Sequence, residues 1–182
     1  VLDFLQHQSA DNLSLRKVAK MVDYSPGTLI NIFGNYAHLL LAVNACTLDQ
    51  ISERLNDKLA QADTLDAQQQ LLLFAQEYLL FAQQHVFQWR LLFEHRLDEE
   101  VPDWQQNRIN QLFDLIEIRL AQLAPNAQQA ELQQASRTIW ASVHGICLLE
   151  SDDKLFASQS INGESMIQSL IKHYLAAWKV SH

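Results

Sequence analysis

The chain has 182 residues, of which 48% are apolar, and a formal net charge of −8 at pH 7. This length suffices for one or two domains with a buried core, the apolar content excludes a disordered chain, and the acidic total argues against a general nucleic-acid coat. Only 4 Gly and 3 Pro interrupt a sequence rich in Leu, Ala and Gln, so we predict an all-α fold.

The location of the protein is predicted from what the sequence lacks. No apolar run approaches the about 18 residues that span a bilayer, and no signal peptide is seen. Cys46 and Cys147 show no metal-binding spacing. We therefore expect a soluble, cytoplasmic protein without a metal or cofactor. Because the chain begins with Val1 rather than Met, we also expect residues upstream of it.

Two short helices are predicted near the start of the chain, after the end of an earlier helix at residues 1–8. Ser14 can cap the first of them, over residues 15–22, because its oxygen can accept an unpaired backbone N–H. The apolar residues expected to face inward are Val18, Ala19 and Val22.

The second short helix is marked by the residues at its two ends. Ser25 is a favoured N-cap, and Pro26 is a favoured first helical residue. Gly34 suits a left-handed C-cap. Residues 15–32 therefore hold two helices with about three residues between them, which is the helix-turn-helix layout.

A long amphipathic helix is predicted over residues 36–60, because apolar residues recur there at helical spacing. Residues 61–64 break the pattern and form the expected linker. Five further helices are expected at residues 66–85, 86–97, 102–123, 127–149 and 162–180. We divide the chain into two domains, residues 1–45 and residues 46–182.

This order of elements resembles the tetracycline-repressor (TetR) family of one-component regulators. The head of that family has Ile-Ala in its first short helix, a Gly-Val turn, Ser-x-Gly-Thr-Leu-Tyr at the start of its recognition helix, then Phe, Lys and a Leu-rich helix. The corresponding residues here are Val18-Ala19, Asp23-Tyr24, Ser25-Pro26-Gly27-Thr28-Leu29-Ile30, Phe33, Tyr36 and Leu39-Leu40-Leu41.

The body of the chain carries a second resemblance. Residues 140–145, Trp-Ala-Ser-Val-His-Gly, are similar to the Trp-His-Gly motif in the ligand-binding domain of one TetR subgroup. Residues 77–82 and 89–94, with His85 between them, resemble the paired helices that precede this motif. Together, the two resemblances imply a helix-turn-helix head followed by a helical body that binds a small-molecule effector and forms a homodimer.

The resemblance implies which residues contact double-stranded DNA. In this family the second short helix enters the major groove, and the positions that correspond here are Ser25, Gly27, Thr28, Ile30, Asn31 and Tyr36. Arg16 and Lys17 on the preceding helix, with Lys20, supply positive charge. Ser25 also has a simpler interpretation as a plain helix cap.

Three positions differ from the family pattern: Asp23 replaces Gly, Ile30 replaces Tyr and Tyr36 replaces Lys. Asp tolerates a left-handed conformation, so the turn can still form. Residues 1–50 contain three basic and four acidic residues, which predicts a head with little positive charge for phosphates. An alternative is therefore a regulator that has lost operator affinity and acts through protein–protein contacts.

Aromatic residues are frequent on helices of the body that we expect to converge. Packing of a core is one explanation, and an apolar cavity for a ligand is another. Arg119 and His144 lie among apolar residues, where a polar group needs a partner. The candidate ligand-pocket residues are Tyr78, Phe81, Trp89, Phe93, Phe113, Arg119, Trp140 and His144.

The last two helices carry more apolar surface than a single contact requires. Gly145 inside a helix costs about 1 kcal/mol relative to Ala, which close approach of another helix would explain. In the resembled family these helices pair across a dimer axis. The implied dimer-interface residues are Gly145, Leu148, Leu170, Tyr174 and Trp178.

An enzyme is the alternative from another class. The sequence has no Gly-rich phosphate loop, no His-x-x-x-His, no Glu-x-x-His pair and no nucleophile elbow. His144 and Cys147 are three residues apart, and we interpret them as packing residues. We expect no enzyme, but a ligand-responsive transcriptional repressor that binds a palindromic operator.

Overall fold

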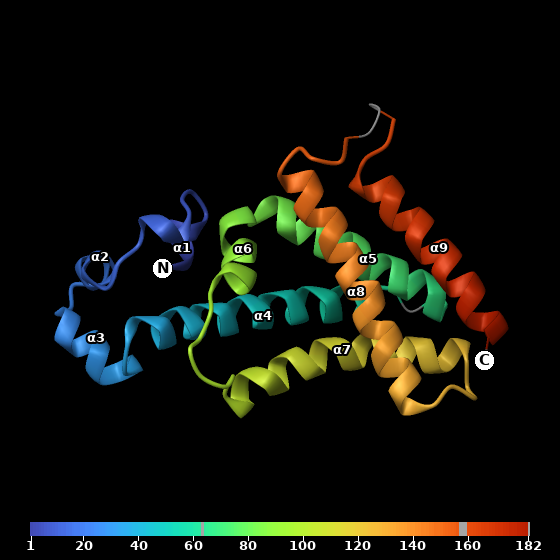
Figure 1. Cartoon of the computed structure of the whole chain (residues 1–182), viewed down its shortest axis with the longest axis horizontal. Helices are drawn as coiled ribbons and strands as arrows, with labels where there is room; N and C mark the ends of the chain where they lie inside the picture. The colour runs from blue at the N-terminus through green and yellow to red at the C-terminus, as the bar shows by residue number, and fades with distance from the viewer. Residues whose placement is uncertain (63, 157–159, 182) are drawn as a thin grey trace. The chain divides into compact units, whose positions relative to one another are not determined.

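The structure is a computed structural model that describes residues 1–62, 64–156 and 160–181 (Figure 1). Within these ranges it contains nine α-helices, one 3-10 helix and no strand, which confirms the predicted all-α fold. The predicted linker at 61–64 lies partly outside the described residues, as does the segment between the helices predicted at 127–149 and 162–180.

The helices follow the predicted order, and most of their bounds lie within about two residues of those expected. They are α1 (Leu2–Leu5), the 3-10 helix η1 (Ala10–Asn12), α2 (Leu15–Met21), α3 (Pro26–Phe33), α4 (Tyr36–Ala60), α5 (Ala67–Gln84), α6 (Val86–Glu94), α7 (Asp103–Leu123), α8 (Gln129–Ser151) and α9 (Gly163–Ser181). The largest differences are at α1 and α6, which each end three residues before the predicted end, at residues 8 and 97.

Local signals explain the two short helices of the head. The Ser14 Oγ accepts the backbone N–H of Lys17, and the Ser25 Oγ accepts that of Thr28 at 3.0 Å. Asp23 between them has a positive φ of 56°, the left-handed conformation that Asp tolerates. The inward position predicted for Val22 is wrong: α2 ends at Met21, and Val22 is 44% exposed.

Contacts divide the chain into two compact units. The first unit is formed by residues 1–50 and 84–108, and the second by residues 51–83 and 109 onward. The core of the first unit consists of Leu5, Leu13, Val18, Ala19, Leu29, Leu39, Leu40, Val43 and Leu91. Leu91 belongs to α6, so this helix completes the core around α2 and α3. The functional division at residue 45 stays a prediction.

Buried polar side chains connect α4 with α6 in the first unit. The Gln88 amide donates to the Thr47 hydroxyl at 3.1 Å and to Gln50 Oε1 at 2.7 Å. The Asn44 amide donates to the backbone carbonyl of Leu91 at 3.3 Å. These bonds supply the partners that buried amides require, and they fix α6 along α4.

The second unit contains α5, α8, α9 and most of α7. Helices α8 and α9 lie side by side (Figure 1). The residues that hold α9 in this unit are fully buried; they are Ile167, Ile171 and Leu175. A buried carboxylate, Glu77 on α5, pairs with Arg54 at 2.6 Å and with Lys58 at 3.4 Å, both from the second half of α4.

Among the described residues, no single helix is long and apolar enough to cross a membrane. Helices α3 and α4 satisfy that criterion only as a pair, and the break between them is bent by 67°.

Candidate functional site

The solvent-facing side of helix α3 carries both polar and apolar residues. Leu29 is 4% exposed and points into the core of the first unit, and Phe33 packs against that core. The opposite side carries Gly27 and Asn31, both exposed, and Ile30 beside them is 38% exposed. These residues are free of core packing and can meet a partner.

Two further residues expected to contact DNA are engaged with each other. The Ser25 and Thr28 hydroxyls are 2.8 Å apart and share a hydrogen bond, while Ser25 also caps α3. Ser25 is exposed and Thr28 is half-buried. The interpretation of Ser25 as a helix cap is therefore confirmed.

Tyr36 lies differently from the sequence-based expectation. Its ring packs against the core of the first unit, and its buried hydroxyl has no hydrogen-bond partner among the residues that the structure describes. Burial also raises the pKa of this phenol. A hydroxyl turned inward cannot reach a phosphate, so we omit Tyr36 from the surface considered below.

The basic residues of α2 are all exposed, and the side chain of Lys17 also contacts other parts of the head. The Lys17 ammonium donates to the backbone carbonyl of Asn12 at 3.0 Å and lies 4.4 Å from the centre of the Phe4 ring. Arg16 and Lys20 are exposed on the same helix. Positive charge is therefore available beside α3 from one short helix.

In the second unit, three helices bring four of the predicted pocket residues together. The Tyr78 hydroxyl on α5 lies 3.1 Å from His144 Nδ1 on α8. His144 stacks on Trp140 with ring centres 5.5 Å apart, and Phe113 on α7 meets Trp140 edge-on at 5.7 Å. We call Tyr78, Phe113, Trp140 and His144 the aromatic cluster.

Three other predicted pocket residues are described by their own burial and contacts. Trp89 is fully buried and packs edge-on against Phe93 at 5.6 Å, but both belong to the first unit. Phe81 is 3% exposed, as expected of a core residue. Within the second unit, the aromatic cluster is a group of predicted pocket residues in direct contact with one another, and the pocket of eight residues stays a prediction.

Arg119 on α7 is a half-buried cation next to an aromatic ring. Its guanidinium lies 5.4 Å from the centre of the Phe74 ring, and it donates to Gln70 Oε1 at 2.9 Å and to the Leu115 carbonyl at 3.1 Å. Burial lowers its pKa. No ion pair to a carboxylate is seen for it within the described ranges, so its charge is compensated by neutral acceptors only.

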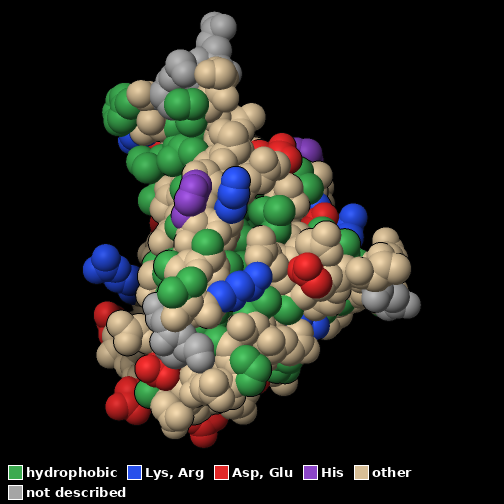
Figure 2. All heavy atoms as spheres, turned by 90° about the vertical axis from the view of Figure 1, so that its right-hand side faces the viewer, with side chains coloured by type: hydrophobic (Ala, Val, Ile, Leu, Met, Phe, Trp, Pro, Cys, Tyr) green, Lys and Arg blue, Asp and Glu red, His purple; other side chains and the backbone are tan. Residues whose placement is uncertain are grey.

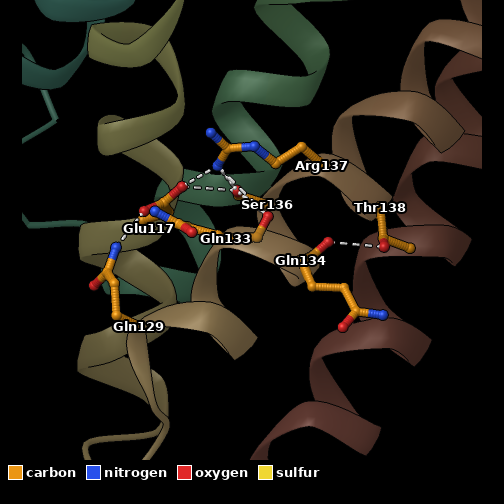
Figure 3. Close-up of polar contacts among 7 residues, drawn as sticks. All are labelled: Glu117, Gln129, Gln133, Gln134, Ser136, Arg137 and Thr138. Carbon is orange, nitrogen blue, oxygen red and sulfur yellow. Dashed lines mark hydrogen bonds and ion pairs between the residues drawn. The ribbon is translucent and has the colours of Figure 1, made fainter.

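A buried carboxylate beside the aromatic cluster was not anticipated from the sequence. Glu117 is 7% exposed and accepts hydrogen bonds from Arg137, from the Ser136 hydroxyl at 3.0 Å and from the Gln129 amide at 2.9 Å (Figure 3). The Arg137 guanidinium also lies 4.1 Å from the centre of the Phe113 ring. Glu117 thus fixes the cation that packs on one edge of the cluster.

The outward faces of α8 and α9 retain apolar residues. Leu148 is 39% exposed, and Leu170 and Tyr174 are half-buried. A Cβ atom at Gly145 would meet no described atom within 4 Å, so packing within the chain gives no reason for glycine there. Hydrophobic side chains also reach the surface among charged ones on the side of the molecule shown in Figure 2.

Trp178 differs from the other predicted interface residues. It is only 8% exposed, and its indole N–H donates to the backbone carbonyl of Leu120 at 3.3 Å. The side chain is thus already used to hold α9 against α7 within one chain. We keep Gly145, Leu148, Leu170 and Tyr174 as the candidate interface.

The two thiols differ in exposure. Cys147 is fully buried, and burial together with the nearby Glu150 raises its pKa to about 12. Cys46 on α4 is exposed. In the part of the chain that the structure describes, no three His, Cys, Asp or Glu side chains converge as metal ligands would.

The burial of His144 predicts a dependence of stability on pH. Desolvation lowers the pKa of His144, so between the ordinary value of about 6.5 and the folded value the unfolded chain binds more protons. Stability is therefore complete above about pH 6.5 and is lost as the pH falls towards the folded pKa. We expect denaturant unfolding at about pH 7.5 and about pH 5.5 to show a larger loss for the native chain than for His144→Gln.

The experiment distinguishes the contribution of His144 to the pH dependence from that of a second histidine. Burial also lowers the pKa of His95 in the first unit, so His144→Gln should keep part of the pH dependence. The variant His173→Gln, at an exposed position, is the matched control. Equal losses for the native chain and His144→Gln would show that the imidazole of His144 is not desolvated.

Comparisons with known proteins support the fold of this site. A family model described as the C-terminal domain of tetracyclin repressor-like proteins matches residues 71–174, which include the whole aromatic cluster. A solved structure of a protein with unknown function from Rhodococcus sp. RHA1 is similar, with a TM-score of 0.77 over 96% of this chain and 89% of that chain. Its sequence identity is 18%, so this likeness concerns the fold alone. No curated protein sequence matches the chain.

Proposed function

Because this chain belongs to the tetracycline-repressor family, whose C-terminal domain its residues 71–174 match, we propose that it is a ligand-responsive transcriptional regulator. In this proposal it binds a palindromic operator as a homodimer and acts as a repressor. The observation that carries the proposal is the solvent-facing side of α3, next to the basic residues of α2. The Trp-His-Gly subgroup remains part of the proposal, on the residues 140–145.

DNA contact is assigned to residues that the structure leaves at the surface. Arg16, Lys17 and Lys20 would neutralise phosphates, which supplies most of the affinity of such heads. Ser25 and Asn31 would donate to phosphates or base edges. Because the head carries few positive charges, useful affinity would require both heads of a dimer.

The experiment is a salt titration of binding to a palindromic operator by the full-length chain. Each lost phosphate contact should reduce the salt slope by about 0.9, so Lys20→Gln should reduce it by about 2 in a dimer. Lys172→Gln, at an exposed position on α9, is the control and should leave the slope unchanged. If the native chain binds no DNA even at low salt, the proposed function is wrong.

Dimerisation is proposed through α8 and α9. Two recognition helices must stand about 34 Å apart to enter successive major grooves on one face of DNA, which a two-fold dimer achieves. The open space around Gly145 and the exposure of Leu148 support close approach of a second chain here. A glycine in the middle of α8 then has a structural reason that one chain alone does not provide.

An effector is proposed to bind at the aromatic cluster. Trp140 and Phe113 offer apolar surface, while Tyr78 and His144 offer a polar pair that could exchange its mutual hydrogen bond for one to a ligand. The effector need only bind one dimer form more tightly by a few kcal/mol to shift the population. Release of the operator would follow if that form sets the two heads at another spacing.

A second candidate is a regulator that acts through protein–protein contacts. The observations that favour it are the acidic Asp23 in the turn and the inward Tyr36 in place of a basic residue. Gel-shift and pull-down experiments on the intact chain distinguish this candidate function from operator binding. Retention of a protein partner with no DNA shift would favour this candidate over the operator-binding function.

A further inference from the structure

The recognition helix lacks every side chain that usually reads a G·C pair. Helix α3, Pro-Gly-Thr-Leu-Ile-Asn-Ile-Phe, contains no Arg or Lys, which bind guanine, and no Asp or Glu, which accept from cytosine. In most readers of the major groove, an Arg or Lys bidentate to guanine is the commonest specific contact. Base recognition by α3 must therefore use other chemistry.

The solvent-facing side of α3 offers one amide between two branched apolar side chains. Successive residues of a helix are rotated by about 100°, so Ile30 and Ile32 flank Asn31 on either side. Asn31 itself is exposed, Ile30 is 38% exposed and Ile32 is 59% exposed. Leu29 on the other side is buried, which fixes the rotation of the helix and so keeps these three residues outward.

Each of these groups matches a feature of an A·T pair. An Asn amide can bond adenine at N6 and N7 together, which no other base allows in the major groove. An apolar side chain such as Ile gains from contact with the C5-methyl group of thymine, which the other bases lack. The three neighbouring side chains thus select the same type of base pair.

Gly27 adds the space that such contacts require. It lies one helical turn before Asn31, and among the described residues a Cβ atom there would meet only the Ser25 Oγ, at an ordinary distance of 3.7 Å. Packing within the chain therefore does not require glycine at this position. The missing side chain lets a base edge or a phosphate approach the start of α3 closely.

We propose that α3 reads A·T pairs in the major groove of the operator half-site, with Asn31 on adenine and with Ile30 and Ile32 against thymine methyl groups. This inference rests on the proposed function and adds the base composition of the operator to it. It commits the two exposed isoleucines to DNA rather than to a protein partner.

The first experiment selects binding sites for the full-length chain from random duplexes. We expect each half-site to contain A·T pairs where α3 meets the bases. Asn31→Ala should fold normally, because residue 31 is exposed, and should lose discrimination at one adenine by about 5- to 150-fold, which corresponds to the usual value of a bidentate contact.

The second experiment removes single methyl groups from the DNA. Replacing one thymidine of the selected site with deoxyuridine leaves all hydrogen bonds intact, and should weaken binding about fourfold where Ile30 or Ile32 contacts that methyl. With Ile30→Ala or Ile32→Ala, the same replacement should have no effect at the thymidine that the missing side chain contacted. Fluorescence anisotropy measures each affinity.

The outcomes distinguish this inference from the function on which it rests. Tight binding to half-sites with G·C pairs at the α3 positions, or equal affinity for thymidine and deoxyuridine throughout, overturns the inference and leaves operator binding intact. Absence of an enriched sequence together with absence of binding at low salt overturns operator binding, and the inference with it.

Discussion

The variant Leu170→Glu is expected to convert the proposed dimer into monomers and to lower operator affinity at least about 100-fold. The affinity falls because two linked heads bind far more tightly than one, by factors of about 100 to 10,000. Leu170 is half-buried beside Tyr174 on α9, and a carboxylate placed in an apolar interface would lose its hydration without a partner. Light scattering measures the mass, and fluorescence anisotropy measures the affinity.

The control for this variant introduces the same negative charge at another position of the same helix. Ala176 is exposed and lies about 120° around α9 from Leu170, so Ala176→Glu should remain a dimer with native affinity. Neither substitution touches the buried residues that hold α9 in its own chain, and far-ultraviolet circular dichroism should be native for both. A Leu170→Glu chain that remains dimeric would exclude this face as the interface.

The variant Glu117→Ala is expected to lower the free energy of unfolding by about 2–3 kcal/mol. Removing one member of a buried ion pair commonly costs about 3–5 kcal/mol. The cost is smaller here because the Arg137 side chain is 41% exposed and can recover some hydration. The Ser136 hydroxyl is fully buried and loses one of its two acceptors, which adds to the cost.

Urea unfolding measures this effect as a lower midpoint at an unchanged slope. Asp114→Ala, at an exposed position on the same helix, is the matched control and should change the stability by less than about 0.5 kcal/mol. The double variant Glu117→Leu with Arg137→Met should recover much of the stability, since it leaves neither charge unpaired. Native stability in Glu117→Ala would show that the carboxylate is not buried in the folded chain.

The sequence predicts the parts of the fold that depend on local signals. The caps Ser14 and Ser25 and the first residue Pro26 locate α2 and α3, because each acts through bonds to the next few residues. The left-handed turn at Asp23 follows from the tolerance of that side chain for positive φ. Periodic apolar residues locate α4 from Tyr36 to Ala60, where no competing signal interrupts the helix.

Features that depend on distant contacts escaped the sequence analysis. Leu91 in the core of the first unit and the buried Gln88 amide could not be assigned, since a helix pattern does not say which unit the helix joins. The inward hydroxyl of Tyr36 depends on the side-chain packing of the head. The exposure of Val22 could not be predicted, because it depends on the end of α2 one residue earlier than expected.

The sequence predicts the kind of site, and its full membership stays a prediction. Aromatic residues that fill a core and those that line a ligand site give the same sequence pattern, so the sequence predicts Trp89, Phe93 and Trp140 as one group. Only the structure separates them by unit. Glu117 could have been suspected as an acid within an apolar stripe, but its partner Arg137 lies 20 residues away on another helix.

The contrast between the two thiols makes the native chain suitable for single-site labelling. A maleimide at neutral pH reacts through thiolate, so it should modify exposed Cys46 and leave buried Cys147 untouched. In a homodimer, each copy then carries one probe on the head-proximal half of α4. A spin label at that position would report the separation of the two heads directly, with and without operator, and no cysteine would have to be engineered.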